Sequence, residues 1–321
     1  MKDAWGRTIE YVRLSLTDAC NFCCPYCRPA EITPQSQTQL LSVDEWMTIL
    51  GAFHHIGVKA VRLTGGEPLL YPHIEELLSR IKESGWFEDI SMTTNGSLLA
   101  SRAQRLKKFG LNRVNISLDS LETEAFATCV GKTGQLESVL DGIRSAINAN
   151  FKSVKINTVL SRYWSDDEVK SLLQYVEKWP VVWRFIEYMP FQGDAFHGPT
   201  FDEWKEQLER ASGGTLTEVH SVYGFGPATY LALPSGKAVG FIFSMSHSYC
   251  DTCNRVRLTS DGQMRLCLLR DDEADLVSLV RNGASEEALA KHIERALQRK
   301  QERHDGIGME QPERPMWRIG G

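Results

Sequence analysis

Short β-branched runs alternate with stretches of helical periodicity over the first 190 residues of the chain. The strand candidates are residues 12–16, 60–64, 90–94, 113–118, 154–159 and 182–188. Between most of them the apolar positions follow helical spacing, most clearly at Leu140, Ile143 and Ile147. Parallel strands need crossover connections, so six strand–helix units in series predict an α/β fold with a parallel sheet. The periodicity is compatible with an incomplete barrel and with an open sheet.

Several helices are predicted within this first part. Ser42 and Glu45 have the spacing of a capping box, which predicts a helix from there to about His55. Apolar spacing predicts further helices around 77–81 and over 98–109, 136–149 and 166–178.

The pattern changes after Pro190, where Gly and Pro become frequent. Residues 229–233 and 239–243 predict two antiparallel strands around a turn at 234–236. Helices are predicted again over 272–300, and the polar tail 301–321 predicts no regular element. We therefore expect three parts, residues 1–200, 201–300 and 301–321.

Polar motifs follow the predicted strands. Cysteines follow the first strand, Gly65-Gly66-Glu67-Pro68 the second, Thr93-Thr94-Asn95-Gly96 the third and Ser117-Leu118-Asp119-Ser120 the fourth, while Lys155 and Asn157 lie in the fifth and residues 187–190 end the sixth. In parallel α/β architectures the carboxyl ends of the strands build the active site. The motifs therefore predict a functional site at one edge of the sheet.

Composition and charge narrow the class of protein. Of 321 residues, 42% are hydrophobic, which is enough for a sizeable core. No apolar run reaches the roughly 18 residues that a membrane span needs, and the first residues lack a signal-peptide pattern, so we expect a cytoplasmic protein without membrane contact. The net charge of -5 argues against general nucleic-acid binding.

Seven of the eight cysteines fall into two tight groups, one near each end of the chain. In the first group, all four of Cys20, Cys23, Cys24 and Cys27 can be considered as ligands of one zinc ion. That interpretation requires the adjacent Cys23 and Cys24 to bind the same metal, although adjacent side chains tend to diverge. A 4Fe–4S cluster held by Cys20, Cys24 and Cys27 leaves Cys23 unused and one iron open to a small molecule. The Gly-Gly-Glu-Pro motif after the next strand favours the cluster, because glycines admit a ligand close to the backbone and Glu67 can accept hydrogen bonds from an ammonium group.

The second group has the spacing Cys-x2-Cys-x13-Cys and consists of Cys250, Cys253 and Cys267. His247 is the residue that would complete a zinc site, whereas three thiolates alone favour a second cluster with an open iron. Arg255 and Arg257 lie between these cysteines and share one strand face, since side chains alternate along a strand. The same segment is thus expected to bind both a cluster and a phosphate.

With these motifs the sequence resembles the radical S-adenosylmethionine (SAM) superfamily, and within it the molybdenum-cofactor biosynthesis protein A family, the GTP 3',8-cyclases. The resemblance covers nearly the whole chain. It is carried by the segments RLSLTDACNFCCPYC, RLTGGEPLL, TTNGSLL, RVNISLDSL, VKIN, RFIEYMP, YCDTCNRVRLTSDGQMRLCL and the terminal IGG. The last three together are specific to the cyclases.

The resemblance implies an incomplete barrel of six βα units, residues 1–200, closed on one side by an α+β domain, residues 201–300, that binds an auxiliary cluster. It implies two 4Fe–4S clusters and SAM as cofactors. The first cluster would reduce SAM and release a 5'-deoxyadenosyl radical, which abstracts hydrogen from carbon 3' of GTP. The carbon radical then attacks carbon 8 of guanine, on the way to (8S)-3',8-cyclo-7,8-dihydroguanosine 5'-triphosphate. The iron left open in the auxiliary cluster would contact the guanine base.

The resemblance also assigns roles to individual residues. The implied contacts to SAM are Tyr26, Gly66, Ser117 and Met189, and those to GTP are Arg13, Arg62, Thr93, Lys155, Arg255 and Arg257. Ser117 as a turn cap, Met189 as a core residue and Thr94 in place of Thr93 are the alternatives. The tail would enter the active site, where Arg318, Gly320 and Gly321 would act in catalysis. The arginines suit a triphosphate because a guanidinium can bind phosphate through two hydrogen bonds.

The chain departs from the family pattern at Cys23, at Cys129 and over residues 301–314. The rival interpretations are another radical SAM enzyme with an auxiliary cluster, such as a peptide-modifying one, and a non-enzymatic zinc-binding interaction protein. The partners implied are an electron donor such as a flavodoxin system and a companion cyclic pyranopterin monophosphate synthase. A homodimer is compatible with the resemblance.

Overall fold

The computed structural model describes residues 1–28, 40–190, 198–219, 224–304 and 314–320. Its strands form one sheet in the order β12-β11-β10-β1-β2-β3-β4-β5-β6-β9-β8-β7. The strands are β1 Tyr11–Ser15, β2 Ala60–Thr64, β3 Asp89–Thr94, β4 Arg113–Ser117, β5 Ser153–Val159, β6 Val182–Ile186, β7 Thr217–Glu218, β8 Thr229–Ala232, β9 Ala238–Ile242, β10 Arg255–Leu258, β11 Gln263–Arg265 and β12 Glu273–Asp275. The six predicted parallel strands are confirmed, in sequence order and within one or two residues.

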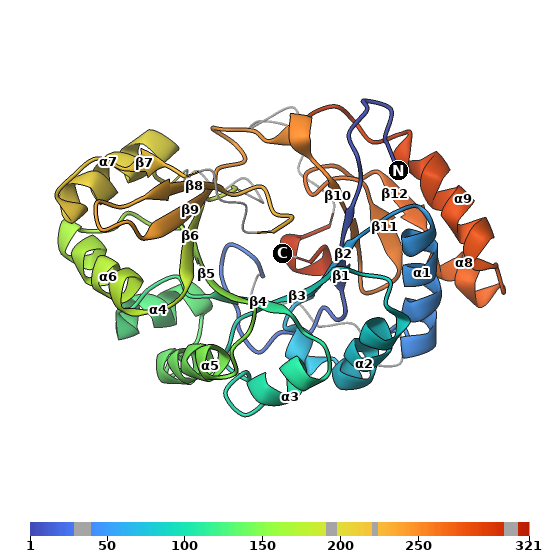
Figure 1. Cartoon of the computed structure of the whole chain (residues 1–321), viewed down its shortest axis with the longest axis horizontal. Helices are drawn as coiled ribbons and strands as arrows, with labels where there is room; N and C mark the ends of the chain where they lie inside the picture. The colour runs from blue at the N-terminus through green and yellow to red at the C-terminus, as the bar shows by residue number, and fades with distance from the viewer. Residues whose placement is uncertain (29–39, 191–197, 220–223, 305–313, 321) are drawn as a thin grey trace.

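The sheet curves around the C-terminus of the chain but does not close (Figure 1). Strands from the second half of the chain extend both of its sides, because β10 pairs parallel with β1 and β9 pairs parallel with β6. This arrangement confirms the α/β class and the incomplete barrel. The predicted antiparallel pair is confirmed as β8 and β9.

Helices cover the outside of the curved sheet (Figure 1). They are α1 Val43–His55, α2 Ile74–Ser84, α3 Ala103–Lys108, α4 Thr123–Val130, α5 Leu136–Asn148, α6 Asp166–Lys178, α7 Phe201–Ser212, α8 Val277–Arg281 and α9 Glu286–Leu297, with 3-10 turns at Pro68–Leu70, Cys250–Thr252 and Met316–Arg318. The Ser42–Glu45 capping box is confirmed in both directions. No described helix combines the length and the apolar character that a membrane span requires.

Two helix predictions were wrong in extent. The stretch 98–109 is helical only over Ala103–Lys108, after a series of turns. The stretch 272–300 contains a short strand, Glu273–Asp275, before its two helices, because these residues pair with β11. Helices α4 and α7 were not predicted, and the division at residue 200 stays a prediction, since the sheet runs across it.

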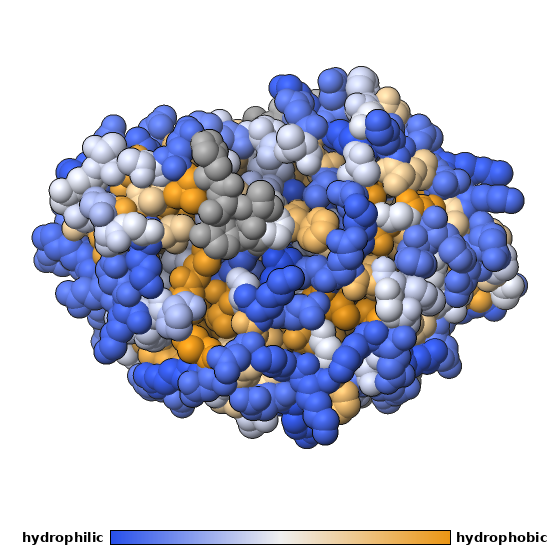
Figure 2. All heavy atoms as spheres, viewed as in Figure 1, coloured by the Kyte–Doolittle hydropathy of each residue, from blue (hydrophilic) through white to orange (hydrophobic). Residues whose placement is uncertain are grey.

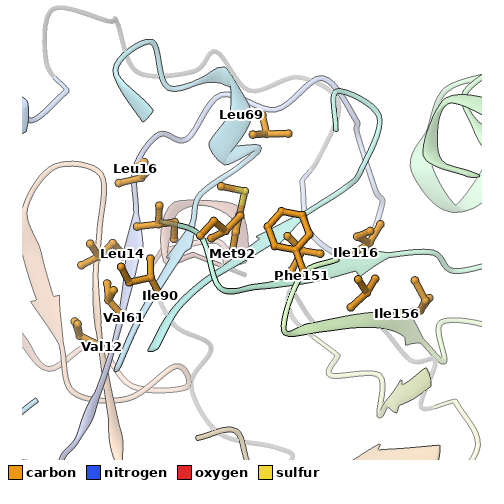
Figure 3. Packing of buried hydrophobic residues seen from close by; sticks show 14 of the residues in the cluster. Val12, Leu14, Leu16, Val61, Leu69, Ile90, Met92, Ile116, Phe151 and Ile156 are labelled. Carbon is orange, nitrogen blue, oxygen red and sulfur yellow. The ribbon is translucent and has the colours of Figure 1, made fainter. Parts of the chain in front are cut away.

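The pleat of the parallel strands separates apolar from polar side chains. Val12, Leu14, Val61 and Ile90 are buried and pack together beside the strands (Figure 3), on the side that the helices cover. The residues between them, Arg13 among them, belong to the opposite face, since side chains alternate along a strand. Hydrophilic residues cover most of the molecular face seen in Figure 2, with hydrophobic ones showing near its centre. The inner face of the sheet is therefore free to carry polar groups.

Candidate functional site

A cavity of about 240 Å³ lies inside the curve of the sheet. It is lined by residues from the carboxyl ends of the parallel strands and the loops after them, by β10 and by the C-terminal tail. The predicted site residues that line it are Arg13, Cys20, Cys24, Tyr26, Cys27, Arg62, Gly66, Thr93, Ser117, Met189, Arg255, Arg257 and Gly320. Segments far apart in the sequence thus meet at the predicted edge.

A second cavity, of about 60 Å³, adjoins the first and is lined by Cys250, Cys253 and Cys267. The two cavities share the lining residues Met189, Tyr249, Arg255, Arg257 and Leu268. The first cysteine group (Cys20, Cys24 and Cys27) and the second (Cys250, Cys253 and Cys267) therefore line two adjoining cavities, with the two arginines of β10 between them.

Some predicted residues lie elsewhere. His247 packs against Phe201 in a different cavity, 4.8 Å between ring centres, so the structure does not place it among the cysteines. Lys155 is buried in β5 behind the cavity lining, its Nζ 3.5 Å from the hydroxyl of Tyr230. Gly321 lies outside the described residues.

The first cysteine loop packs tightly against the Gly-Gly-Glu-Pro turn. The Gly66 N–H donates to the carbonyl of Thr17, and a side chain at Gly66 would meet the carbonyl oxygen of Ala19 at 2.3 Å. Only glycine permits this approach. The Cys20 sulfur accepts hydrogen bonds from the Phe22 N–H and from Asn95 Nδ2, as donors commonly do around cluster thiolates.

Burial keeps the thiols of the first cysteine group protonated. It raises the pKa of Cys27 to about 12 and that of Cys24 well above the ordinary thiol value, and nearby Asp119 adds to the effect on both. A metal or cluster must therefore displace protons from this group, which is the usual linkage for thiolate ligands. Three cysteine sulfurs lining one cavity, two donors aimed at one of them and a glycine cradle fit an iron–sulfur cluster with one open iron, once the thiols are deprotonated.

The zinc alternative was also tested against the geometry. Within the described ranges, no three His, Cys, Asp or Glu side chains converge as ligands of a single metal ion. The ligands of a 4Fe–4S cluster bind different irons and stand further apart, so this result leaves the cluster assignment unaffected.

Glu67 differs from the expectation that its carboxylate meets an ammonium group. The residue is fully buried, and its carboxylate accepts hydrogen bonds from Thr94 Oγ1, the Asn95 N–H and the Leu69 N–H. Burial raises its pKa to about 7. It does not line the main cavity, and it ties the second strand's loop to that of the third. The hydroxyl of Thr94 is occupied by its hydrogen bond to Glu67. Thr93 Oγ1 has no partner among the described residues, which favours Thr93 over Thr94 as the ligand contact.

Asp119 holds the side chain of Tyr26. The Tyr26 hydroxyl donates to Asp119 Oδ2 over 2.7 Å, and Asp119 Oδ1 accepts from the Val159 N–H. Burial raises the pKa of Asp119 to about 6. Sequence reasoning placed Asp119 in a strand-end motif without a role, because the partner Tyr26 lies 93 residues away.

Three arginines form a row across neighbouring strands. Arg13 of β1 pairs in register with Arg62 of β2 on one side and with Arg257 of β10 on the other. Burial and the neighbouring Arg257 lower the pKa of Arg13, and burial is also the main cause of the lowered pKa of Arg62. Crowded, largely buried cations are stabilised when an anion enters, so this row suits a polyphosphate.

Arg184 is a cavity residue that sequence reasoning missed. Its guanidinium donates to the side-chain oxygens of Asn157 and Asn115, at 2.6 and 2.7 Å. The three residues lie on three consecutive strands, β4, β5 and β6. Arg184 lies in the segment RFIEYMP. Because Arg184 and Phe185 are neighbours on β6, their side chains point to opposite faces of the sheet, and this alternation could have indicated that Arg184 faces the cavity.

Cations surround the second cysteine group. Arg7 Nη1 donates to the carbonyl of Cys250 over 2.9 Å, and Lys300 lines the same small cavity. Although burial alone would raise it, the pKa of Cys250 is lowered to about 6 by hydrogen bonding to His304. The pKa of Cys253 is lowered in the same way, against burial, chiefly by Lys300 and Arg255. The lowered pKa values favour the thiolate form, which cluster binding requires. His304 and Arg7 were not predicted from the sequence, because both lie far from Cys250 along the chain and only the fold brings them to it.

The C-terminal tail enters the main cavity. Trp317 and Ile319 are buried, and the carbonyl of Gly320 accepts a hydrogen bond from Arg257 Nη1 over 3.0 Å. Arg318 is exposed and lies over the Trp317 ring, 5.0 Å from its centre, so it does not line the cavity. Arg257 thus binds the tail as well as facing the region predicted for phosphate.

Known proteins resemble this chain over its whole length. Residues 14–176 match the family model of the radical SAM superfamily, and residues 181–306 match that of the molybdenum cofactor synthesis C-terminal domain. Curated proteins named GTP 3',8-cyclase from Desulforamulus reducens and Pelotomaculum thermopropionicum are each 38% identical to the chain, over 100% of both sequences. Molybdenum cofactor biosynthesis protein 1 of Mus musculus is 38% identical over 100% of this chain and 51% of its own length.

Solved structures support the fold. The crystal structure of Streptococcus suis SuiB bound to S-adenosylmethionine superposes with a TM-score of 0.63, at 15% sequence identity, over 88% of this chain and 68% of SuiB. Full-length matches of 38% identity and the two family models lead to one conclusion: the chain belongs to the radical SAM superfamily and, within it, to the GTP 3',8-cyclase family.

Proposed function

We propose that this chain is a radical SAM GTP 3',8-cyclase, which converts GTP to (8S)-3',8-cyclo-7,8-dihydroguanosine 5'-triphosphate in molybdenum cofactor biosynthesis. The observation that carries the proposal is the position of the arginine row between two three-cysteine groups that line adjoining cavities. The first group and the second group would each hold a 4Fe–4S cluster. When bound, the first cluster and SAM supply the carbon-centred radical that the cyclisation needs.

The protein's own residues bind and orient the two small molecules. Tyr26, Gly66, Ser117 and Met189 are the proposed SAM contacts, and Asp119 keeps the Tyr26 hydroxyl oriented. Arg13, Arg62, Arg255 and Arg257 are the proposed ligands of the triphosphate, which would be the anion that their crowded charges favour. The sheet and the tail both line the cavity in which the two small molecules would react. An electron donor such as a flavodoxin system, a companion synthase and a cytoplasmic location belong to the same proposal.

Anaerobic turnover is the test of this function. Protein reconstituted with iron and sulfide is incubated with SAM, GTP and a reductant, and the products are separated by chromatography with mass detection. The proposal expects 5'-deoxyadenosine and the cyclised triphosphate in equal amounts. SAM cleavage without a product derived from GTP, in reconstituted protein with both clusters, would contradict it.

Proton uptake on GTP binding is expected from Lys155. Burial, aided by Arg184 and Arg113, lowers the pKa of Lys155 to about 6, so its amine is mostly neutral at pH 7.5. A bound triphosphate favours the ammonium form and raises this pKa, so binding takes up a proton and GTP affinity falls as the pH rises above 6. Calorimetry in buffers of different ionisation enthalpy at pH 7.5 measures the uptake. Lys155→Met should lose it, and equal uptake in both proteins would exclude Lys155 as its source.

Gly320→Ala is expected to reduce cyclisation by about tenfold or more while iron content stays unchanged. Gly320 has a φ of +75°, and a side chain there would meet Thr64 Oγ1 at 2.7 Å, so alanine displaces the tail from the cavity. Deletion of Gly320 and Gly321 should stop cyclisation and leave GTP binding intact. Gly236→Ala is the matched control, since φ there is +88° but no atom lies within 4 Å. Full activity of Gly320→Ala would show that cyclisation does not depend on the position of Gly320 in the cavity.

A further inference from the structure

The tail is joined to the first cysteine loop (residues 17–28) by an arginine–tryptophan contact. Arg28 directly follows Cys27, and its guanidinium carbon lies 5.4 Å from the centre of the Trp317 ring. The same guanidinium donates through Nη1 to the carbonyl of Cys20 over 3.3 Å. Arg28 is 8% exposed and Trp317 1% exposed. A cation–π contact withdrawn from water is considerably stronger than an exposed one.

The other end of the tail touches the arginine row. Three residues after Trp317, the carbonyl of Gly320 accepts from Arg257, and the Gly320 backbone packs against Thr64 at the end of β2. Ile319 between them is fully buried. One short segment therefore bridges the loop that carries the first cysteine group and the cations that face the proposed triphosphate.

We propose that Arg28 is a positioning residue that acts through Trp317. Arg28 holds the tryptophan ring against the cysteine loop, and this contact sets where Gly320 lies relative to Arg257. Arg318 also lies over the ring, but it is exposed, so its contribution is smaller. The inference rests on the proposed function. If the arginine row binds GTP and the first cysteine loop cleaves SAM, then the tail connects the GTP site to the loop that cleaves SAM.

Hydrogen–deuterium exchange of the C-terminal peptide tests the contact directly. We expect Arg28→Met and Trp317→Leu each to raise the exchange rate of the tail amides by about tenfold or more, because the tail loses its anchor. The double variant should show no further increase, since both changes remove the same contact. Arg162→Met is the matched control: Arg162 lies over Trp164, 4.6 Å from its centre, and its loss should leave tail exchange unchanged.

Two outcomes would overturn the proposal: tail exchange in Arg28→Met equal to that of the unmodified protein, or additive increases in the double variant. Because Arg28 neighbours a cysteine of the first group, iron content is measured in parallel. If Arg28→Met loses iron, the tryptophan variants decide, with Trp317→Phe expected to restore protection and Trp317→Leu to lose it. Exchange is measured without turnover, so a failure of the proposed GTP cyclisation leaves this result readable. If the unmodified protein cyclises GTP, Arg28→Met should lower the rate of cyclisation about tenfold at unchanged iron content.

Discussion

Replacing Cys24 with alanine is expected to abolish SAM cleavage and, with it, all formation of cyclised product. Cys24 is half-buried, lines the main cavity with Cys20 and Cys27, and would be one of three ligands to the first cluster. With three thiolates there is no spare ligand, so loss of one leaves two irons unligated by protein. The same result is expected for Cys20→Ala and Cys27→Ala. Release of 5'-deoxyadenosine under reducing conditions is the measurement, with iron content and the spectrum of the reduced cluster alongside.

The adjacent Cys23 offers a control within the same loop. Cys23 is half-buried and does not line the cavity, and its N–H donates to the carbonyl of Val130 of α4. Cys23→Ala should therefore keep the cluster and cleave SAM at the unmodified rate. If Cys23→Ala lost iron while Cys24→Ala retained it, the assignment of the ligands would be reversed.

The sequence was sufficient for the elements whose signals are local. Each of the six parallel strands is a β-branched run, and each of the five after the first follows a helical stretch, so the hydrophobic periodicity and the length of the connections both indicated parallel pairing. Helix α4 was missed because it is eight residues long and follows a polar turn. The strand at Glu273–Asp275 was missed because its charged residues favour helix and only pairing with β11 makes it a strand.

The candidate site divides in the same way. Cysteine spacing is local and indicated the two cysteine groups, whereas the resemblance to the cyclase family assigned the contacts to SAM and GTP, most of which line the cavity. Glu67, Arg184 and His304 were not assigned their contacts, because each depends on partners distant in sequence: Asn95, Asn115 and Cys250 respectively. Arg318 shows the converse, since the family resemblance assigned it to the active site, but it is exposed and stacks on its neighbour Trp317 outside the cavity.

The two cysteine groups also differ in their surroundings in a way that sequence did not indicate. Burial and carboxylates raise the thiol pKa values of the first group, whereas the pKa of Cys250 and of Cys253 is lowered by His304 and Lys300. Since cations stabilise the more negative state of a cluster and anions oppose it, the two sites would hold clusters of different electronic character. We therefore expect removal of the first group to abolish SAM cleavage, and removal of the second group to abolish GTP cyclisation alone.

Cys253→Ala is expected to stop GTP cyclisation while SAM cleavage survives. The thiol lies in the small cavity, separated from the first cysteine group by the shared arginines, so its removal should leave the first cluster in place. Iron content should fall by about half, because one of two 4Fe–4S clusters is lost. Cyclisation should fail, because the second cluster is the proposed contact of the guanine base. Cys250→Ala and Cys267→Ala should behave alike.

His247→Ala is the matched control for that experiment, since His247 was the alternative fourth ligand but packs against Phe201 in another cavity. It should retain both the full iron content and cyclisation. Iron, 5'-deoxyadenosine and cyclised triphosphate are measured on the same preparations, so that the two activities are compared at known cluster content. Normal cyclisation in all three variants, Cys250→Ala, Cys253→Ala and Cys267→Ala, would show that the second cluster is dispensable and would exclude it as the contact of the guanine base.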